Sequence, residues 1–238
     1  MSARAFGVTA GLDPGVATPL ARRCEELGYA SIWSNDHPGA AGLETLAAFA
    51  EGAERLELGL DRERLWIGVG AGFSERPLTT MRNSLPALRE AIPGVRLVLA
   101  AMGPKMCALA GSGFDGAFLN WMTPEFAARA RAHVHAGARD AERTPPPVLG
   151  YVRTAVGSDA GERLAKEESF YRDLHDGYRN HFARLGEPEG TVGVGASDPE
   201  SVQAELSRYA ALDVVVVRAL ASATFEAMAG LAEAAAPA

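Results

Sequence analysis

Lysine is nearly missing from this chain of 238 residues. Lys105 and Lys166 are its two lysines, so arginine supplies almost all of the positive charge. Acidic residues outnumber basic ones by 30 to 23, which gives a formal net charge of −7. This shortage of positive charge argues against a nucleic acid or an anionic membrane surface as the partner. We therefore expect a protein that acts on a small molecule.

Cysteines are few, and long apolar runs are absent. Cys24 and Cys107 fall in predicted helices with apolar neighbours, and no CxxC or Cys/His spacing suggests a metal site. We expect two buried, reduced thiols in a cytoplasmic protein. No apolar run reaches the roughly 18 residues of a membrane span, and the first six residues lack the apolar segment of a signal peptide.

Short apolar runs alternate with amphipathic segments along the whole chain. The runs predict strands at 5–10, 29–33, 56–60, 65–70, 95–101, 115–121, 147–156 and 214–217. The segments between them predict helices at 20–27, 43–53, 78–92, 104–111, 124–137, 159–185, 199–211 and 224–234. Three of these helices should begin at a capping residue followed by proline, at Thr18-Pro19, Thr123-Pro124 and Asp198-Pro199.

Eight strand candidates that alternate with helices predict an α/β fold, a TIM-like (β/α) barrel with parallel strands. The length suits one lean barrel, so residues 1–238 are interpreted as a single domain. An open, doubly wound sheet is the alternative.

The third and fourth strand candidates interrupt this regular pattern. They are separated by Asp61–Arg64 alone, whereas a crossover between parallel strands takes about a dozen residues or more. Either the two candidates form an antiparallel hairpin, or one of them is not a barrel strand. We expect a barrel that is incomplete around strands three and four and lacks a helix there.

The second strand candidate ends in the polar cluster Ser34, Asn35, Asp36 and His37. Chemistry in a parallel barrel takes place at the carboxyl ends of the strands, so Asp36 and His37 are the catalytic candidates and Asn35 a ligand contact. The alternative is a simple turn, in which Asp36 accepts hydrogen bonds from the local backbone.

Three further strand ends are candidates for binding a ligand. The glycine-rich exit Gly70-Ala71-Gly72 allows a ligand to approach the backbone, although these glycines could equally serve tight packing. The turn after the fifth strand opens a helix whose free N–H groups suit a phosphate, and an ordinary turn is the alternative; its residues are Ala101, Met102, Gly103, Pro104 and Lys105.

The sixth strand candidate ends in Asn120 and Trp121. The amide can hydrogen-bond the edge of a heterocycle, and the indole can stack on one or belong to the core. Of the five histidines, His37 alone follows a strand candidate; His175 and His181 lie on the polar helix 159–185 and are predicted to be solvated.

Three segments of the chain carry a family resemblance. They are Leu27–His37 with the helix that follows, Ile67–Gly72, and Gly103–Gly111 together with Asp115–Trp121. In order and spacing, residues 4–135 resemble the bacterial-luciferase-like superfamily. Within it they are similar to the branch that depends on the deazaflavin coenzyme F-420, which includes methylenetetrahydromethanopterin reductase. The chain would be a shortened member.

The resemblance implies hydride transfer between coenzyme F-420 and an organic substrate, in a TIM-like barrel. Asp36 and His37 would lie near the reactive face, with His37 orienting the substrate or moving a proton. The turns after strands four, five and six would line the cofactor.

Two other functions stay open. One is an FMN-dependent monooxygenase of the same fold. The other is a degenerate, non-catalytic barrel that binds a flavin-like ligand or another protein chain, which the shortened region around Asp61–Arg64 favours. We expect a homodimer for two reasons. A missing helix would expose an apolar face that a partner covers, and members of this family are commonly dimeric.

Overall fold

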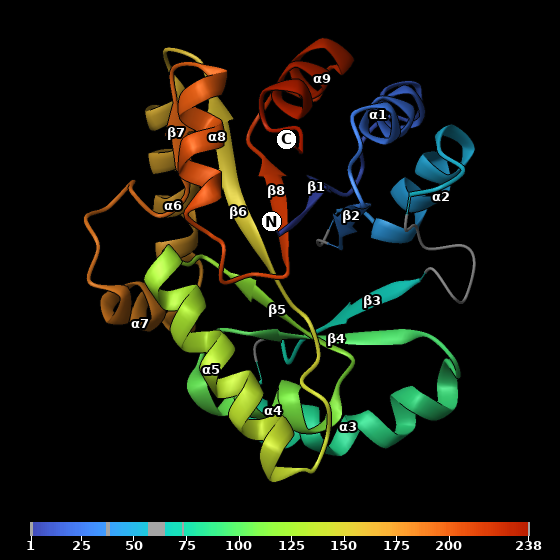
Figure 1. Cartoon of the computed structure of the whole chain (residues 1–238), viewed down its shortest axis with the longest axis vertical. Helices are drawn as coiled ribbons and strands as arrows, with labels where there is room; N and C mark the ends of the chain where they lie inside the picture. Colours follow the sequence, from blue (N-terminus) through green and yellow to red (C-terminus); the bar gives the residue numbers. More distant parts are fainter. Residues whose placement is uncertain (1, 37–38, 57–64, 73, 238) are drawn as a thin grey trace.

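One parallel sheet forms the centre of the molecule (Figure 1). The computed structural model describes residues 2–36, 39–56, 65–72 and 74–237. Going round the sheet, the strands follow in the order β3-β4-β5-β6-β8-β1-β2, and β7 pairs with the far end of β6. Their bounds are β1 Ala3–Thr9, β2 Ser31–Asn35, β3 Trp66–Val69, β4 Arg96–Ala101, β5 Gly116–Asn120, β6 Val148–Val156, β7 Val194–Ala196 and β8 Val214–Ala219.

The sheet is an open barrel rather than a closed one. Apart from β7, the strands neighbour one another in chain order, and β8 returns to pair with β1 as in a barrel. Within the described part of the chain, no pairing joins β2 to β3. The prediction of a TIM-like fold that is incomplete around the third and fourth strand candidates is therefore confirmed, and the doubly wound alternative is wrong. The candidate at 56–60 falls outside the described residues except for Leu56, which is not in a strand.

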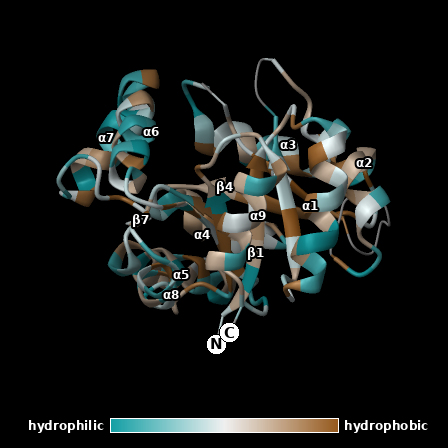
Figure 2. Cartoon of the chain, turned by 90° about the horizontal axis from the view of Figure 1, so that it is seen from above, coloured by the Kyte–Doolittle hydropathy of each residue, from teal (hydrophilic) through white to brown (hydrophobic). Residues whose placement is uncertain are grey.

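Helices surround the strands on the outside (Figure 1). Figure 2 shows apolar strands in the middle and polar residues on the outward faces of the helices, as expected when side chains sort by hydropathy. Within the described ranges, no helix is both long and apolar enough to cross a membrane. The helices are α1 Pro14–Glu26, α2 Gly42–Gly52, α3 Pro77–Ala91, α4 Pro104–Gly113, α5 Pro124–Asp140, α6 Ala160–Leu174, α7 Asp176–Leu185, α8 Pro199–Ser207 and α9 Phe225–Ala234.

Two of the three predicted helix starts are confirmed. Thr123 accepts a hydrogen bond from Phe126 N at 3.1 Å, and Asp198 accepts one from Ser201 N at 2.9 Å. The prediction at Thr18-Pro19 is wrong, because Asp13-Pro14 carries the same signature five residues earlier and Asp13 caps α1. Thr18 lies inside that helix and donates to Ala48 O of α2 at 2.9 Å.

The predicted polar helix 159–185 is two helices, which meet at His175. His175 leaves the helical conformation, with φ −163°, and its Nδ1 accepts from Gly177 N to cap α7. The prediction that His181 is solvated is also wrong, since its side chain is fully buried. The turn at His175 folds α7 back so that His181 and Phe182 face the core instead of water.

Both thiols are buried and free, one in α1 and one in α4, as predicted. Burial raises the pKa of Cys107 to about 12, so that thiol stays protonated and unreactive.

An ion pair fastens the amino-terminal ends of β4 and β5. Arg89 of α3 donates to both carboxylate oxygens of Asp115, at 2.6 and 2.8 Å, and Leu97 N donates to the same carboxylate. Burial opposes ionisation of Asp115, but these hydrogen bonds outweigh it and lower its pKa. In a barrel, interactions at this end stabilise the fold and leave the opposite end to the ligand.

Candidate functional site

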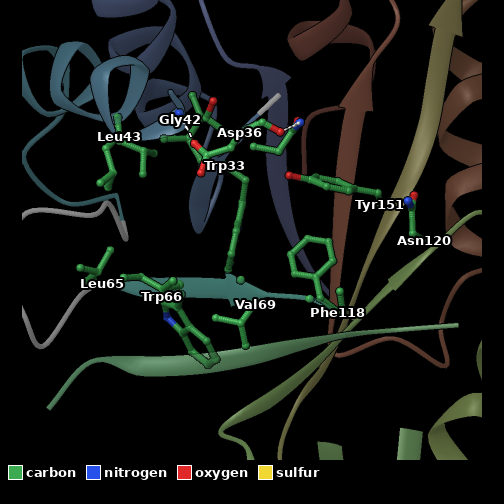
Figure 3. A pocket seen from close by; sticks show the side chains of 18 of the residues that line it. Trp33, Asp36, Gly42, Leu43, Leu65, Trp66, Val69, Phe118, Asn120 and Tyr151 are labelled. Carbon is green, nitrogen blue, oxygen red and sulfur yellow. Dashed lines mark hydrogen bonds between the residues drawn. The ribbon is translucent and has the colours of Figure 1, made fainter. Parts of the chain in front are cut away.

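A cavity of about 650 Å³ lies at the carboxyl ends of the strands, between the edge strands β2 and β3 (Figure 3). Strands β4, β5 and β6 contribute residues to its inner wall. The lining residues are Ile32, Trp33, Ser34, Asn35, Asp36, Gly42, Leu43, Leu46, Leu65, Trp66, Ile67, Gly68, Val69, Gly70, Gly72, Ala100, Phe118, Asn120 and Tyr151.

Three aromatic side chains form the inner wall of this cavity. Alternate residues of each strand point into the barrel, which brings Trp33 of β2, Phe118 of β5 and Tyr151 of β6 together. The ring centroids of Trp33 and Phe118 are 5.0 Å apart, and those of Phe118 and Tyr151 are 4.6 Å apart. Such contacts hold the rings in fixed positions, so the wall is preformed and apolar.

The opposite wall is the inner face of β3 and the glycines that follow it. Trp66 lies at the start of this face, and Gly68 and Gly70 follow it at alternate positions, Gly70 just past the end of the strand, so beyond Trp66 the backbone is exposed to the cavity. A Cβ on Gly70 would lie 3.3 Å from the Cβ of Ala100, which shows how closely β4 approaches. A flat ring could lie between this backbone and the aromatic side chains, which is an arrangement that suits a flavin or a deazaflavin.

Asp36 lines the cavity and also caps a helix. Its Oδ1 accepts a hydrogen bond from Gly42 N, at the start of α2, at 2.5 Å. The alternative in which Asp36 accepts hydrogen bonds from the local backbone is therefore correct for this one contact. His37, the other catalytic candidate, lies outside the described residues.

Two polar atoms beside Asp36, Asn35 Oδ1 and Ser34 Oγ, are buried and have no hydrogen-bond partner among the residues that the structure describes. Buried polar atoms normally have partners, so an unsatisfied pair in a cavity wall is available to a ligand or a water molecule. Asn35 Nδ2 donates to Asp36 O at 3.2 Å, which fixes the amide with its oxygen as the free acceptor.

The other predicted ligand contacts divide into two groups. Gly70, Gly72 and Asn120 line the cavity. The turn that leads into α4 does not: Ala101, Met102, Gly103, Pro104 and Lys105 are not among the lining residues, nor is Ala71. The start of α4 still has no side-chain cap, so its backbone N–H groups remain open to a ligand.

Trp121 belongs to a packing cluster rather than to the cavity wall. It is 1% exposed and packs against Tyr171 and Phe182 of the α6–α7 pair. Its φ of 49° turns the chain in the left-handed region, which is rare for a bulky residue and directs the indole away from the cavity. His181 anchors this turn, since its ring hydrogen-bonds to Trp121 O.

Sequence reasoning did not predict the wall residues Trp33 and Phe118, and it also missed Tyr151, Arg153 and Arg218. Tyr151 lines the cavity, and the two arginines lie beside it on β6 and β8 with 2% and 5% exposure. Arg153 donates to Asn120 Oδ1 and Arg218 donates to Thr9 Oγ1. The available signal was a charged residue at an inward position of an otherwise apolar strand, because Arg218 follows four valines directly.

Comparison with known proteins places this chain in a family. A sequence model described as luciferase-like monooxygenase matches residues 72–224, well over half of the chain. The chain belongs to the luciferase-like monooxygenase family. The resemblance drawn from its motifs is thereby confirmed.

A curated relative is the 5,10-methylenetetrahydromethanopterin reductase of Methanolobus tindarius. It is 27% identical over 148 residues, which covers 52% of this chain and 45% of the relative. The chain thus matches less than half of the length of that enzyme.

Solved structures agree with this assignment at the level of the fold. An F-420-dependent secondary alcohol dehydrogenase, in complex with an F-420–acetone adduct, has a TM-score of 0.71 at 13% identity, covering 98% of this chain and 99% of its own. The oxygenating constituent of 3,6-diketocamphane monooxygenase from Pseudomonas putida, in complex with FMN, has a TM-score of 0.62 at 12% identity, covering 98% and 97%. The luciferase-like fold of this chain is therefore shared by proteins that bind either cofactor.

Proposed function

We propose that the chain is an oxidoreductase that transfers a hydride between coenzyme F-420 and a small organic substrate. The observation that carries this proposal is the cavity whose one wall is the bare backbone of Gly68 and Gly70 and whose other wall is aromatic. A planar three-ring system fits between such walls. When bound, the deazaflavin ring would supply the hydride chemistry, and the protein would supply orientation and a dry environment.

The proposed roles of the site residues follow from where they lie. Asn35, Gly70, Gly72 and Asn120 would contact the ring, because they line the cavity and include amide groups able to bond a heterocycle edge. Asp36 would hold the start of α2 against the cavity. His37 would orient the substrate or move a proton, a role that rests on the sequence motif.

The turn from Ala101 to Lys105 is proposed to hold the outer part of the cofactor. Its open helix start and Lys105 suit a phosphate that extends beyond the cavity. Trp121 is not included in this proposal, because its indole packs under α6 and α7.

An FMN-dependent monooxygenase is the second candidate, since an FMN-bound enzyme shares the fold. The two candidates differ in their chemistry: a reduced flavin reacts readily with oxygen, whereas a reduced deazaflavin does not. Oxygen consumption by the reduced, cofactor-loaded protein therefore separates them.

A titration of the purified protein with coenzyme F-420 and, separately, with FMN tests the proposal. We expect the absorbance and fluorescence of coenzyme F-420 to change with saturation at micromolar concentrations, and to change less with FMN. Tight binding of FMN alone, with oxygen uptake after reduction, would replace the proposal by the monooxygenase. Binding of neither would leave a non-catalytic scaffold.

The oligomeric state is proposed to be a homodimer. Leu43, Phe170 and Leu174 are large apolar side chains with 62%, 59% and 43% exposure, and a second subunit would be one way to cover them. Light scattering coupled to size exclusion should give twice the mass of the chain, and the mass of a single chain would contradict the dimer.

A further inference from the structure

Two arginines lie directly opposite each other inside the barrel. Arg153 of β6 and Arg218 of β8 are partners in the register of the two neighbouring parallel strands. Residues in register point to the same side of a sheet, and here Tyr151 and Val216, two positions earlier, both face the interior cluster. Like charges placed opposite each other repel, so this arrangement needs a compensating interaction.

No acidic side chain of the described residues forms an ion pair with either arginine, although the carboxylate of Glu167 attracts Arg153 from further away. Arg153 and Arg218 are 2% and 5% exposed, and within the described ranges neither forms an ion pair. Guanidinium groups stay charged at ordinary pH, even though burial lowers the pKa of Arg153. Buried charges in proteins are usually paired, which makes two unpaired neighbours a sign of a missing anion.

The contacts that the arginines do make are neutral. Arg153 lies 4.1 Å from the ring centroid of Trp121 and 5.0 Å from that of Tyr171, and its buried Nε has no hydrogen-bond partner in the described part of the chain. Arg218 donates to the Thr9 hydroxyl. These contacts fix the two guanidinium groups in place without a directly bonded carboxylate, so most of their positive charge is available to an anionic ligand.

Tyr151 connects the arginine pair to the cavity. Both guanidinium carbons flank its ring, at 5.9 Å for Arg153 and 5.7 Å for Arg218. Figure 3 shows that the Tyr151 side chain extends into the cavity and that its hydroxyl group is the end that points inward. Burial raises the pKa of Tyr151 and the arginines counteract it only in part, so the hydroxyl remains a hydrogen-bond donor.

We propose that the Tyr151 end of the cavity, backed by Arg153 and Arg218, binds the anionic oxygens of a ligand, either a carboxylate or a phosphate. Tyr151 donates the direct hydrogen bond, and the arginine pair supplies the charge behind it. The inference extends the proposed function and rests on it for the identity of the ring-bearing ligand. The anion belongs either to the side chain of the cofactor or to an acidic substrate.

Inorganic phosphate is the first probe, because it tests the anion site without any cofactor. Thermal unfolding of the whole chain is followed in phosphate and in chloride at equal ionic strength. The wild type should be stabilised by phosphate beyond chloride, and Arg218→Gln should weaken the apparent phosphate affinity by about tenfold or more. Arg218→Lys should keep part of the effect, since it keeps the charge.

Arg4→Gln is the matched control. Arg4 is also an arginine of a barrel strand, but it bonds to Gln203 and to Ala235 O at the opposite end of the barrel. Its variant should keep the phosphate effect in full. Arg218→Gln is preferred to a change at Arg153, because Arg153 also supports the packing of Trp121 and Tyr171.

Paired cofactors then identify the source of the anion. FMN is compared with riboflavin, and coenzyme F-420 with its ring fragment that lacks the phosphate. If the cofactor supplies the anion, the phosphorylated member binds more tightly in the wild type and loses that advantage in Arg218→Gln. If an acidic substrate supplies it, each pair binds alike while the phosphate effect still depends on Arg218.

The proposal is overturned if phosphate gives no stabilisation beyond chloride, or if Arg218→Gln is stabilised as much as the wild type. Failure of the proposed function gives a different result: neither ring system binds, yet phosphate still stabilises the chain through Arg218. The two ideas can therefore fail separately.

Discussion

Gly7 of β1 and Tyr151 of β6 are in close contact across the inside of the barrel. A Cβ added to Gly7 would lie 2.9 Å from Tyr151 Cε1 and 3.2 Å from a methyl group of Val216. A real Cβ does not approach that closely, so the ring of Tyr151 keeps its place because residue 7 has no side chain. The glycine therefore sets the position of a residue that lines the cavity.

The first prediction concerns that contact. Gly7→Ala should push the Tyr151 ring toward the cavity and lower the free energy of unfolding by about 1–3 kcal/mol through overpacking. Urea denaturation measures the change. Gly161→Ala, in α6, is the control, because a Cβ there meets nothing within 4 Å and alanine favours a helix. An unchanged stability of Gly7→Ala would show that Tyr151 moves aside freely.

The second prediction separates the hydroxyl of Tyr151 from its ring. Tyr151→Phe keeps the packing and removes a donor that has no recorded hydrogen bond in the described part of the chain. The free energy of unfolding should change by less than about 1 kcal/mol, while the apparent phosphate affinity should fall by about tenfold.

Tyr209→Phe is the control for that experiment. The hydroxyl of Tyr209 is buried and donates to Met122 O at 3.1 Å, so its loss should destabilise the chain by about 1–3 kcal/mol without affecting phosphate. Equal effects of the two variants on phosphate binding would contradict a specific role for Tyr151.

Periodicity predicted most of the barrel. Local patterns located seven of the eight strands found in the described ranges, because an apolar run between turn residues is enough to mark a buried strand. Strand β7, Val194–Ala196, was missed because it is short and contains glycine. It exists through its pairing with the end of β6, which is a tertiary interaction.

The site was predicted less completely than the fold. Asn35, Asp36, Gly70, Gly72 and Asn120 were predicted from their places at or just after a strand end, and all five line the cavity. Tyr151, Arg153 and Arg218 come together only because β6 and β8 are adjacent in the sheet, and three helices and β7 separate these two strands in the sequence. Burial of His181 likewise depends on the turn at His175, which the helical pattern does not reveal.

The third prediction tests the motif at the end of β2. His37→Ala should lower the rate of hydride transfer by roughly 10²–10⁴-fold, the usual range for loss of an acid–base group. The affinity for coenzyme F-420 should stay within about threefold of the wild type, since the ring is held by other residues. His133→Ala, on the exposed face of α5, should leave both values unchanged. Full turnover by His37→Ala would remove His37 from the mechanism.

The fourth prediction concerns the pH dependence of stability. Burial lowers the pKa of His181 below its ordinary value, although its hydrogen bond to Trp121 O opposes this. The unfolded chain therefore binds a proton on this residue more readily than the folded chain does. Stability should fall as the pH drops below about 6.5, by up to about 1.4 kcal/mol per pH unit from this residue.

His181→Gln provides the measurement, because its amide can still donate to Trp121 O but does not titrate in this range. Urea unfolding between pH 7.5 and 5.5 should show a flatter stability curve for this variant than for the wild type. His133→Gln, which changes an exposed histidine, should keep the wild-type slope. If His181→Gln and the wild type lose stability in parallel, the acid sensitivity arises elsewhere and His181 is protonated equally in both states.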